Sequence, residues 1–365
     1  MKRVLCILSG MNVGGAETFL MKIYRRIDGT KYQMDFCINV FEKCFYEDEI
    51  LSLGGKIYRI PSKSVSPKNF KKQLYDVVQM NGYKYVLRVS SNAAGFMDLK
   101  IAHKAGAKIC AARSSNSSDG GGLIVKLAHR FGSILYGKYI NVRIAPSDLA
   151  AKYTFGQKAY ENGSVSILHN AIDIEKYSYS VEMRNCIRSE FDISDTTTVI
   201  GHVGRFMTQK NHVFLLEVFC EYAKTNTKSV LMLVGGGELE SIIKEKALAL
   251  GISDKIIFTG VRPDVPALLS AMDVFVFPSL YEGMPNTVIE AQATGLPCIV
   301  ADTITREADI TGLVHYLPLG NASEWADYIV QLPKVIRETP IQKLKENCYD
   351  IETVAEQFVK LIFRE

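Results

Sequence analysis

Residues 274–291 read VFVFPSLYEGMPNTVIEA, an apolar run followed by a turn and the start of a helix. The run at 274–278 has the length and the branched and aromatic side chains of a buried strand, and residues 287–294 have helical spacing. Gly283 and Pro285 mark the turn between them. The stretch therefore predicts a strand–turn–helix unit of an α/β protein.

The same order recurs along the chain. In the first half, strands are expected at 4–8, 34–40, 85–89, 108–112, 140–145 and 164–168, and helices at 16–27, 70–80, 99–105 and 123–136. In the second half, strands are expected at 198–203, 229–234, 255–259, 274–278 and 297–301, and helices at 212–225, 238–250, 265–271, 287–294, 322–332 and 351–364. This alternation predicts parallel sheets built from βαβ units.

The 365 residues are enough for two such domains. We expect a Rossmann-like, doubly wound domain at 1–170, a polar connector at 171–197 and a second Rossmann-like domain at 198–345. Residues 346–365 are expected to form a helix that packs back on the first domain. Ligands of such sheets bind beyond the carboxyl ends of the strands, so functional residues should follow strands directly.

Composition narrows the class of protein. The chain is 47% hydrophobic and 22% charged, as in soluble globular proteins, and it has no apolar run of 18 residues. Residues 1–8 read as a first strand rather than a signal peptide, because no small-residue cleavage site follows. The eight cysteines include no C-x-x-C pair, which predicts free thiols in a reducing cytoplasm.

The net charge of +4 is divided unevenly. Residues 1–170 carry 25 Lys and Arg against 12 Asp and Glu, whereas residues 171–365 carry 18 against 27. The basic half predicts an anionic partner: acidic lipid headgroups, a pyrophosphate-linked acceptor or nucleic acid, with scattered solvated lysines as the plain alternative. The cluster of Lys63, Lys68, Lys71 and Lys72 is the candidate membrane contact. No interleaved aromatic and basic motif supports nucleic acid.

Two glutamates eight residues apart, Glu282 and Glu290, lie in the turn and in the first turns of the helix. Ionised carboxylates accept hydrogen bonds, so the pair suits the hydroxyls of a ribose or hexose. Gly283 permits close approach of the backbone, and the amides at the helix start, where Asn286 is the expected cap, can hold a phosphate. Acidic residues that only complement the helix dipole would give the same pattern.

Cations and glycines follow two other strands of the second half. Arg205 and Lys210 lie after the strand at 198–203, where two cations can neutralise a diphosphate, although an ordinary surface loop would look the same. Gly235-Gly236-Gly237 follows the strand at 229–234 and offers a place for close contact with a ligand. The turn does not complete G-x-G-x-x-G, which argues against a nicotinamide dinucleotide.

A further glycine pair, Gly14-Gly15, follows the first strand and opens a helix, so that backbone amides face the expected cleft. No Gly-Lys-Ser or Gly-Lys-Thr follows, so the segment is not a P-loop.

Together these motifs resemble the GT-B glycosyltransferases of family 4, especially those that build bacterial exopolysaccharide and capsule. The resemblance covers nearly the whole chain and implies a retaining, metal-independent transfer from a nucleotide-diphosphate sugar, with UDP the expected nucleotide and no cofactor. It rests on Gly14 to Glu17, Gly204-Arg205 with Lys210-Asn211, Gly235 to Gly237, Phe277 to Ser279 with Glu282 and Glu290, Ala293 to Pro297, and His169 to Asp173, where Ala171 replaces a glycine.

The resemblance also implies a role for each matching residue. Arg205 and Lys210 would hold the diphosphate and, with Glu282, are the catalytic candidates. Glu290 would accept from the ribose hydroxyls, and backbone near 261–262 would meet the base. The amide of Gly15 would approach the diphosphate when the cleft closes. The other donor-binding candidates are Gly204, Gly235, Gly236, Val261, Arg262, Gly283, Met284, Pro285, Asn286 and Thr287.

One part of the family pattern is absent. Two first-domain segments that often carry histidines read ARSSN at 112–116 and VSSN at 89–92 here. The acceptor would then be oriented by other side chains, and the leaving phosphate would itself take the proton; loss of activity is the alternative. The acceptor candidates are Asn12, Ser91, Arg113, Ser115 and Asn116.

The sequence as a whole predicts a cytoplasmic enzyme at the inner face of the membrane, with no nucleic-acid partner. It would move a hexose or N-acetylhexosamine to a polyprenyl-linked or polysaccharide acceptor. A sugar-nucleotide epimerase of the same two-domain shape and a non-catalytic sugar-nucleotide-binding protein are the alternatives.

Overall fold

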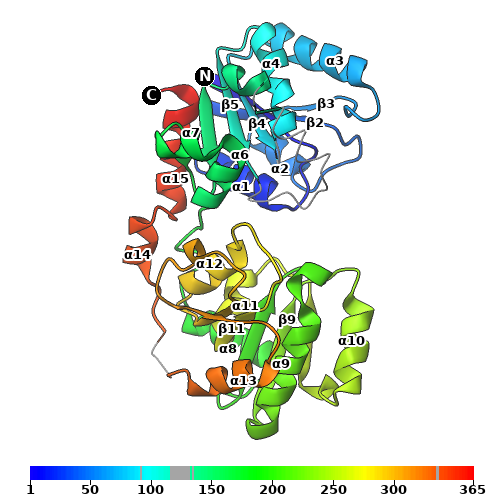
Figure 1. Cartoon of the computed structure of the whole chain (residues 1–365), viewed down its shortest axis with the longest axis vertical. Coiled ribbons are helices and arrows are strands. Elements are labelled where there is room, and N and C mark those ends of the chain that lie inside the picture. The colour runs from blue at the N-terminus through cyan, green and yellow to red at the C-terminus, as the bar shows by residue number, and fades with distance from the viewer. Residues whose placement is uncertain (91–92, 116–131, 134, 334–336) are drawn as a thin grey trace. The chain divides into compact units, whose positions relative to one another are not determined.

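The computed structural model describes residues 1–90, 93–115, 132–133, 135–333 and 337–365. They form two compact units (Figure 1): residues 1–171 with 348–365, and residues 172–347. The expected helix at 123–136 lies largely outside the described residues. All eight cysteines are free thiols.

The described part of the first unit contains a seven-stranded sheet in the order β3-β2-β1-β4-β5-β6-β7, parallel throughout. The chain winds outward in one direction from β1 to β3 and in the other from β4 to β7, as the alternating pattern predicts. The strands are β1 (Lys2–Ile7), β2 (Tyr32–Ile38), β3 (Ile57–Arg59), β4 (Tyr85–Ser90), β5 (Ile109–Ser114), β6 (Val142–Ala145) and β7 (Ser166–Ile167). The helices are α1 (Gly15–Tyr24), α2 (Glu47–Ser52), α3 (Pro67–Met80), α4 (Met97–Lys104), α6 (Asp148–Phe155), α7 (Gln157–Glu161) and α15 (Ile351–Phe363).

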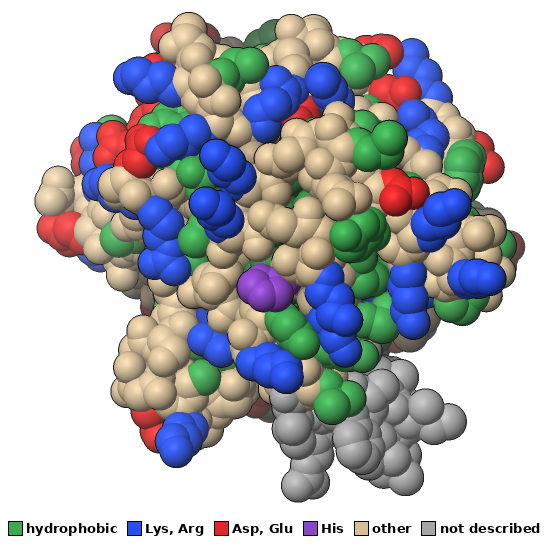
Figure 2. Space-filling model, turned by 90° about the horizontal axis from the view of Figure 1, so that it is seen from above, with side chains coloured by type: hydrophobic (Ala, Val, Ile, Leu, Met, Phe, Trp, Pro, Cys, Tyr) green, Lys and Arg blue, Asp and Glu red, His purple; other side chains and the backbone are tan. Residues whose placement is uncertain are grey.

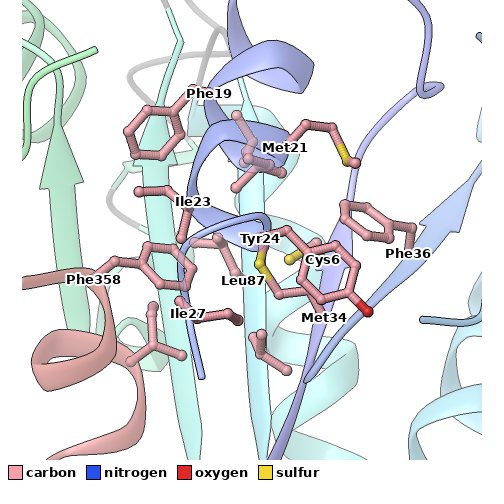
Figure 3. Close-up of a cluster of buried hydrophobic side chains, with 14 of the residues drawn as sticks. Cys6, Phe19, Met21, Ile23, Tyr24, Ile27, Met34, Phe36, Leu87 and Phe358 are labelled. Atoms are coloured by element: carbon pink, nitrogen blue, oxygen red, sulfur yellow. The ribbon is translucent and has the colours of Figure 1, made fainter. Parts of the chain in front are cut away.

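Helices α1 and α15 share one core with the first sheet (Figure 3). Phe19 and Tyr24 of α1 lie there with Cys6 of β1, Leu87 of β4 and Phe358 of α15, all buried. Fully burying a large apolar side chain contributes about 1.5–3 kcal/mol, so the apolar face of α15 holds this last helix on the first unit. A second core, around α3 and α4, covers the opposite side of the sheet.

The second unit contains a six-stranded parallel sheet in the order β10-β9-β8-β11-β12-β13. Its strands are β8 (Thr198–Val203), β9 (Ser229–Val234), β10 (Ile256–Gly260), β11 (Val274–Phe277), β12 (Cys298–Ala301) and β13 (Val314–Leu317). Its helices are α8 (Val181–Glu190), α9 (His212–Thr225), α10 (Glu240–Ala249), α11 (Val265–Ala271), α12 (Asn286–Ala293), α13 (Ala322–Gln331) and α14 (Ile341–Glu346). The strand order reverses between β8 and β11, so the position expected for a ligand is beyond the carboxyl ends of these two strands.

Residues 171–197, interpreted from the sequence as a polar connector, include the helix α8, which packs on α11. Polar groups hold it in place. The buried Arg188 pairs with Asp273 at 2.7 Å, and the same carboxylate oxygen accepts from the Val199 amide at 2.8 Å. An attachment that depends on a partly buried ion pair leaves no apolar stripe in the sequence. The sequence therefore gives no reason to expect a helix there.

Candidate functional site

The loops that follow β8 and β11 are joined directly to each other. Lys210 Nζ lies 2.6 Å from Glu282 Oε1. The Leu280 amide donates to the Gln209 carbonyl at 2.8 Å, and Gln209 Nε2 donates to the Tyr281 carbonyl at 2.7 Å. Two motifs that are 72 residues apart in the sequence therefore form one surface at the switch point of the second sheet.

This surface carries a net positive charge. The Lys210 and Glu282 side chains are 16% and 13% exposed, and Lys210 Nζ also lies 4.6 Å from the centre of the Phe277 ring. Arg205 lies in the same loop as Lys210 and is exposed. The two loops thus contribute two cations, Arg205 and Lys210, and one carboxylate, Glu282, and this charge balance favours an anionic ligand.

The start of α12 adds backbone donors. The helix begins at Asn286 with Pro285 at its N-cap, and its first turn contains no acidic residue. The backbone amides at the start of a helix and the helix dipole attract an anion such as a phosphate. Gly283 and Met284 lie in the turn just before, and Thr287 is in the first turn itself; all three are half-buried.

Glu290, the second glutamate of the pair, lies one turn further along α12 and is half-buried. The Tyr177 hydroxyl donates a hydrogen bond to its carboxylate. Tyr177 is 9% exposed, and burial, followed by the charge of Glu290, raises the pKa of its phenol. Tyr177 is the functional candidate that the sequence interpretation missed.

The glycine-rich turn after β9 approaches the protein's own backbone. A Cβ atom at Gly235, where φ is +135°, would lie 2.2 Å from the Gly204 carbonyl oxygen, and one at Gly237 would lie 2.5 Å from the Phe206 carbonyl oxygen. The Phe206 amide donates to the Gly236 carbonyl at 3.0 Å. These glycines therefore hold the loop that carries Arg205 in place, which is a structural reason for them beside the expected ligand contact.

The loop after β10 carries the residues expected near a base. Val261 is 84% exposed. The Arg262 guanidinium pairs with Glu190 at 2.5 Å and with Asp264 at 2.7 Å, and these contacts raise its pKa. The Arg262 side chain is thus engaged with carboxylates of its own unit, and the exposed loop at 261 is the part open to a ligand.

Two buried histidines lie next to the loop that carries Lys210. The His202 and His212 rings are 4.8 Å apart at their centres, and His202 Nδ1 contacts the Val276 carbonyl at 2.8 Å. Burial, followed for His212 by the charge of Lys210, lowers the pKa of His212 to about 4, and burial lowers the pKa of His202 well below its usual value. Both rings are therefore neutral near pH 7, which suits a packing role.

The candidates of the first unit are more scattered. Gly15 is the first residue of α1 and is exposed. Asn12 Oδ1 accepts from the Phe45 amide at 2.9 Å, which joins the loops after β1 and β2. Ser115, just beyond β5, is exposed, and its amide donates to the Ser90 carbonyl at 3.1 Å. Ser91 and Asn116 lie outside the described residues.

Arg113 is 1% exposed, unlike a residue that meets a ligand from solution. Its guanidinium carbon lies 3.7 Å from the centre of the Phe19 ring, and Nη2 donates to Asn170 Oδ1 at 2.6 Å. Burial lowers its pKa to about 9. The structure thus gives Arg113 a packing role in the first unit and does not present its guanidinium to an acceptor.

The described residues lack two further kinds of feature. No group of three or more His, Cys, Asp or Glu side chains is placed so that it could hold a metal ion. None of the described helices has both the length and the apolar composition needed to cross a bilayer.

Comparison with known proteins identifies the class of protein. The family model of glycosyl transferases group 1 matches residues 197–334, which contain the Lys210–Glu282 pair. EpsF of Bacillus subtilis (strain 168), whose name classes it as a glycosyltransferase, is 36% identical over 338 residues, 90% of this chain and 87% of that protein. The UDP-Gal:α-D-GlcNAc-diphosphoundecaprenol α-1,3-galactosyltransferase of Escherichia coli is 35% identical over 141 residues, 38% of this chain and 36% of that one. The crystal structure of Anabaena HepE in complex with UDP matches with a TM-score of 0.71 at 17% identity, over 100% of this chain and 96% of that one.

The two parallel α/β units have the GT-B fold, and the family match and the similarity to EpsF identify the chain as a glycosyltransferase. The chain belongs to the glycosyl transferases group 1 family.

Proposed function

We propose that the protein is a retaining, metal-independent glycosyltransferase of family 4 that takes a hexose or N-acetylhexosamine from a UDP-sugar. The acceptor is a lipid-linked or polysaccharide glycan of a surface polymer. UDP is the preferred nucleotide because HepE was crystallised with UDP and the E. coli relative is named for UDP-Gal. A lipid diphosphate acceptor is in keeping with the same E. coli name.

The observation that carries the proposal is the ion pair between Lys210 and Glu282, with the exposed Arg205 in the same loop. In the proposed complex, Arg205 and Lys210 contact the diphosphate of the donor. The first-turn amides of α12 contact the second of its two phosphate groups. Glu290, positioned by Tyr177, accepts from the ribose hydroxyls. Glu282 contacts the donor sugar while it keeps Lys210 in place.

The same groups account for catalysis. As the bond between the anomeric carbon and the phosphate oxygen breaks, negative charge grows on the leaving diphosphate. Cations and amides already aimed at that oxygen stabilise the transition state more than the ground state. The acceptor hydroxyl gives its proton to the leaving phosphate oxygen and forms the new bond to the anomeric carbon, so no separate base is needed.

We place the protein in the cytoplasm at the inner face of the membrane, where a lipid-linked acceptor is found. The net positive charge of residues 1–170 supports contact with anionic lipid.

Thermal unfolding with UDP-, GDP-, ADP- and dTDP-sugars tests the donor site. Ligand at about 100 times its dissociation constant stabilises the native state by roughly 2.7 kcal/mol. We expect a shift with UDP-sugars that is lost in Glu290→Ala and Arg205→Ala. Lys228→Ala is the matched control, because Lys228 is exposed and precedes β9 at the opposite end of the sheet.

The outcomes of this experiment distinguish the proposed function from the two alternatives, a non-catalytic binding protein and an epimerase. A shift with no sugar nucleotide contradicts the proposal. A shift without transfer favours the non-catalytic binding protein, and conversion of the donor into an epimeric sugar nucleotide favours the epimerase.

A further inference from the structure

A groove of about 490 Å³ lies between α3 and α4 on the first unit. Four of its lining residues are lysines, two from each helix, and none of the described residues that line it is acidic. Figure 2 shows a face of the first unit on which Lys and Arg side chains gather among hydrophobic ones. The lining lysines are Lys71, Lys72, Lys100 and Lys104.

The remaining lining residues make an apolar floor. They are Tyr75, Met97, Ile101 and Tyr136, and all four are half-buried. On α3 the groove residues fall at 71, 72 and 75, and on α4 at 97, 100, 101 and 104, which is the three-and-four spacing of one helix face. Each helix thus turns one face that is both cationic and apolar toward the groove.

The groove differs from the membrane contact predicted from the sequence. That prediction centred on the cluster from Lys63 to Lys72. Lys63 is committed elsewhere: its Nζ lies 2.6 Å from Oδ1 of the buried Asp98, which also pairs with Arg88 at 3.0 Å. Lys63 therefore balances an internal carboxylate, whereas the α3–α4 groove adds Lys100 and Lys104 from a helix not considered in the prediction.

We propose that the α3–α4 groove is the docking site of the protein on an anionic phospholipid bilayer. The lysine ammonium groups contact headgroup phosphates, while the apolar floor receives the upper part of the lipid tails. Lysines suit this arrangement because their long apolar stems can lie along an apolar surface with the charge at the phosphate level. The proposal rests on the lipid-linked acceptor of the proposed function, and it names the surface by which the enzyme reaches that acceptor.

The chemistry of the groove favours a lipid over a soluble polyanion. A nucleic acid or a free phosphate needs cations, but it does not need a Met and Ile floor between them. Two contributions add together in the free energy of binding to a bilayer surface: burial of apolar area and electrostatic attraction to anionic lipid. Each cation near such a surface increases binding about fivefold.

Sedimentation with vesicles tests the proposal. The full chain is mixed with vesicles of phosphatidylcholine alone or with added phosphatidylglycerol. Wild type is compared with the groove variant Lys71→Gln, Lys72→Gln, Lys100→Gln, Lys104→Gln. The control variant carries the same charge change at exposed lysines outside the groove: Lys56→Gln, Lys84→Gln, Lys108→Gln, Lys158→Gln.

We expect wild type and the control variant to bind the anionic vesicles, and the groove variant to bind at least about tenfold more weakly. A third variant, Tyr75→Gln with Met97→Gln, keeps the four lysines and should also bind more weakly. Equal binding by the groove variant and wild type would overturn the proposal, as would equal losses in groove and control variants or absence of wild-type binding. If the third variant binds like wild type, the apolar floor is not engaged and the lipid proposal fails in favour of a purely ionic site.

Donor-induced thermal stabilisation is measured on the same variants, because it reports on the second unit. Retained stabilisation with lost vesicle binding supports the proposal. If donor sugars fail to stabilise wild type itself, the proposed function is rejected. The vesicle experiment would still show whether the groove binds anionic lipid.

Discussion

Lys210 Nζ and Glu282 Oε1 are 2.6 Å apart and join the loops at the carboxyl ends of β8 and β11. Each partner is mostly removed from water, so each depends on the other to balance its charge. The pair holds Lys210 in place. Under the proposed function, catalysis and local stability would share this one contact.

Lys210→Met should therefore lower kcat/KM by about 10²–10³-fold, the effect of removing one charge-stabilising group from a transition state. Initial rates across a range of UDP-sugar concentrations measure it. Lys228→Met serves as the control and should keep the wild-type rate. A wild-type kcat/KM in Lys210→Met would show that the diphosphate lies elsewhere.

A separate prediction concerns the energetic coupling between Lys210 and Glu282. Loss of Lys210 leaves a half-buried carboxylate unpaired, so Lys210→Met should be less stable than the double variant Lys210→Met, Glu282→Gln. A double-mutant cycle in urea should give an interaction energy of about 0.5–3 kcal/mol. Additive effects of the two substitutions would mean that the ion pair contributes no stability.

Tyr177→Phe tests the positioning of Glu290. Removing one hydrogen bond to a charged group should raise KM for the UDP-sugar about fivefold and leave kcat nearly unchanged. The effect should shrink with a donor whose ribose lacks its hydroxyls, which a merely structural role would not produce. Tyr179→Phe, two residues further along, is the control. An equal effect on both donors would contradict the positioning role.

Acid should destabilise the protein through His212. Its pKa is lowered to about 4 in the folded state, below the ordinary value of about 6.5 that the unfolded chain has. Between these two pKa values the unfolded state therefore binds more protons than the folded state. The neutral His212 ring contributes up to about 3 kcal/mol to the free energy of unfolding; this contribution is complete above pH 6.5 and is lost as the pH falls toward 4. In His212→Phe, the free energy of unfolding should change less steeply with pH than in wild type. His103→Phe, at an exposed histidine, should keep the slope; equal slopes in all three proteins would refute the prediction.

Gly235→Ala should lower the free energy of unfolding by more than about 2 kcal/mol and abolish donor-induced stabilisation, because the new Cβ meets the Gly204 carbonyl. Gly251→Ala is the matched comparison. Gly251 also has positive φ, but a Cβ there meets nothing within 4 Å, so the cost should be near 1 kcal/mol. Chemical denaturation of both variants measures the difference, and equal costs would mean that the close approach of the two loops does not matter.

Much of the second unit could be predicted from the sequence because its elements are apolar runs bounded by turn residues. Helix α9, strand β9 and helix α11 have the expected bounds. Short or half-exposed elements gave no such signal: α2 is six residues long, and three of the four residues of β13 are half-buried.

Side-chain partners across the fold were not predictable. The Tyr177–Glu290 hydrogen bond joins residues more than a hundred positions apart, and no spacing marks it. The family resemblance predicts that Arg113 orients the acceptor, yet its guanidinium stacks on Phe19 inside the first unit. Lys63 was predicted to contact a membrane because it belongs to a cluster of lysines. The buried Asp98 that pairs with it cannot be recognised from composition.

Calorimetric titration with UDP tests the central claim most directly, that Arg205 and Lys210 form a diphosphate site in the second unit. We predict that wild type and Lys228→Ala bind UDP with the same dissociation constant. Arg205→Ala and Lys210→Met should each bind at least about tenfold more weakly, or about 1.4 kcal/mol. Equal binding of UDP by all four proteins would show that neither cation belongs to a diphosphate site.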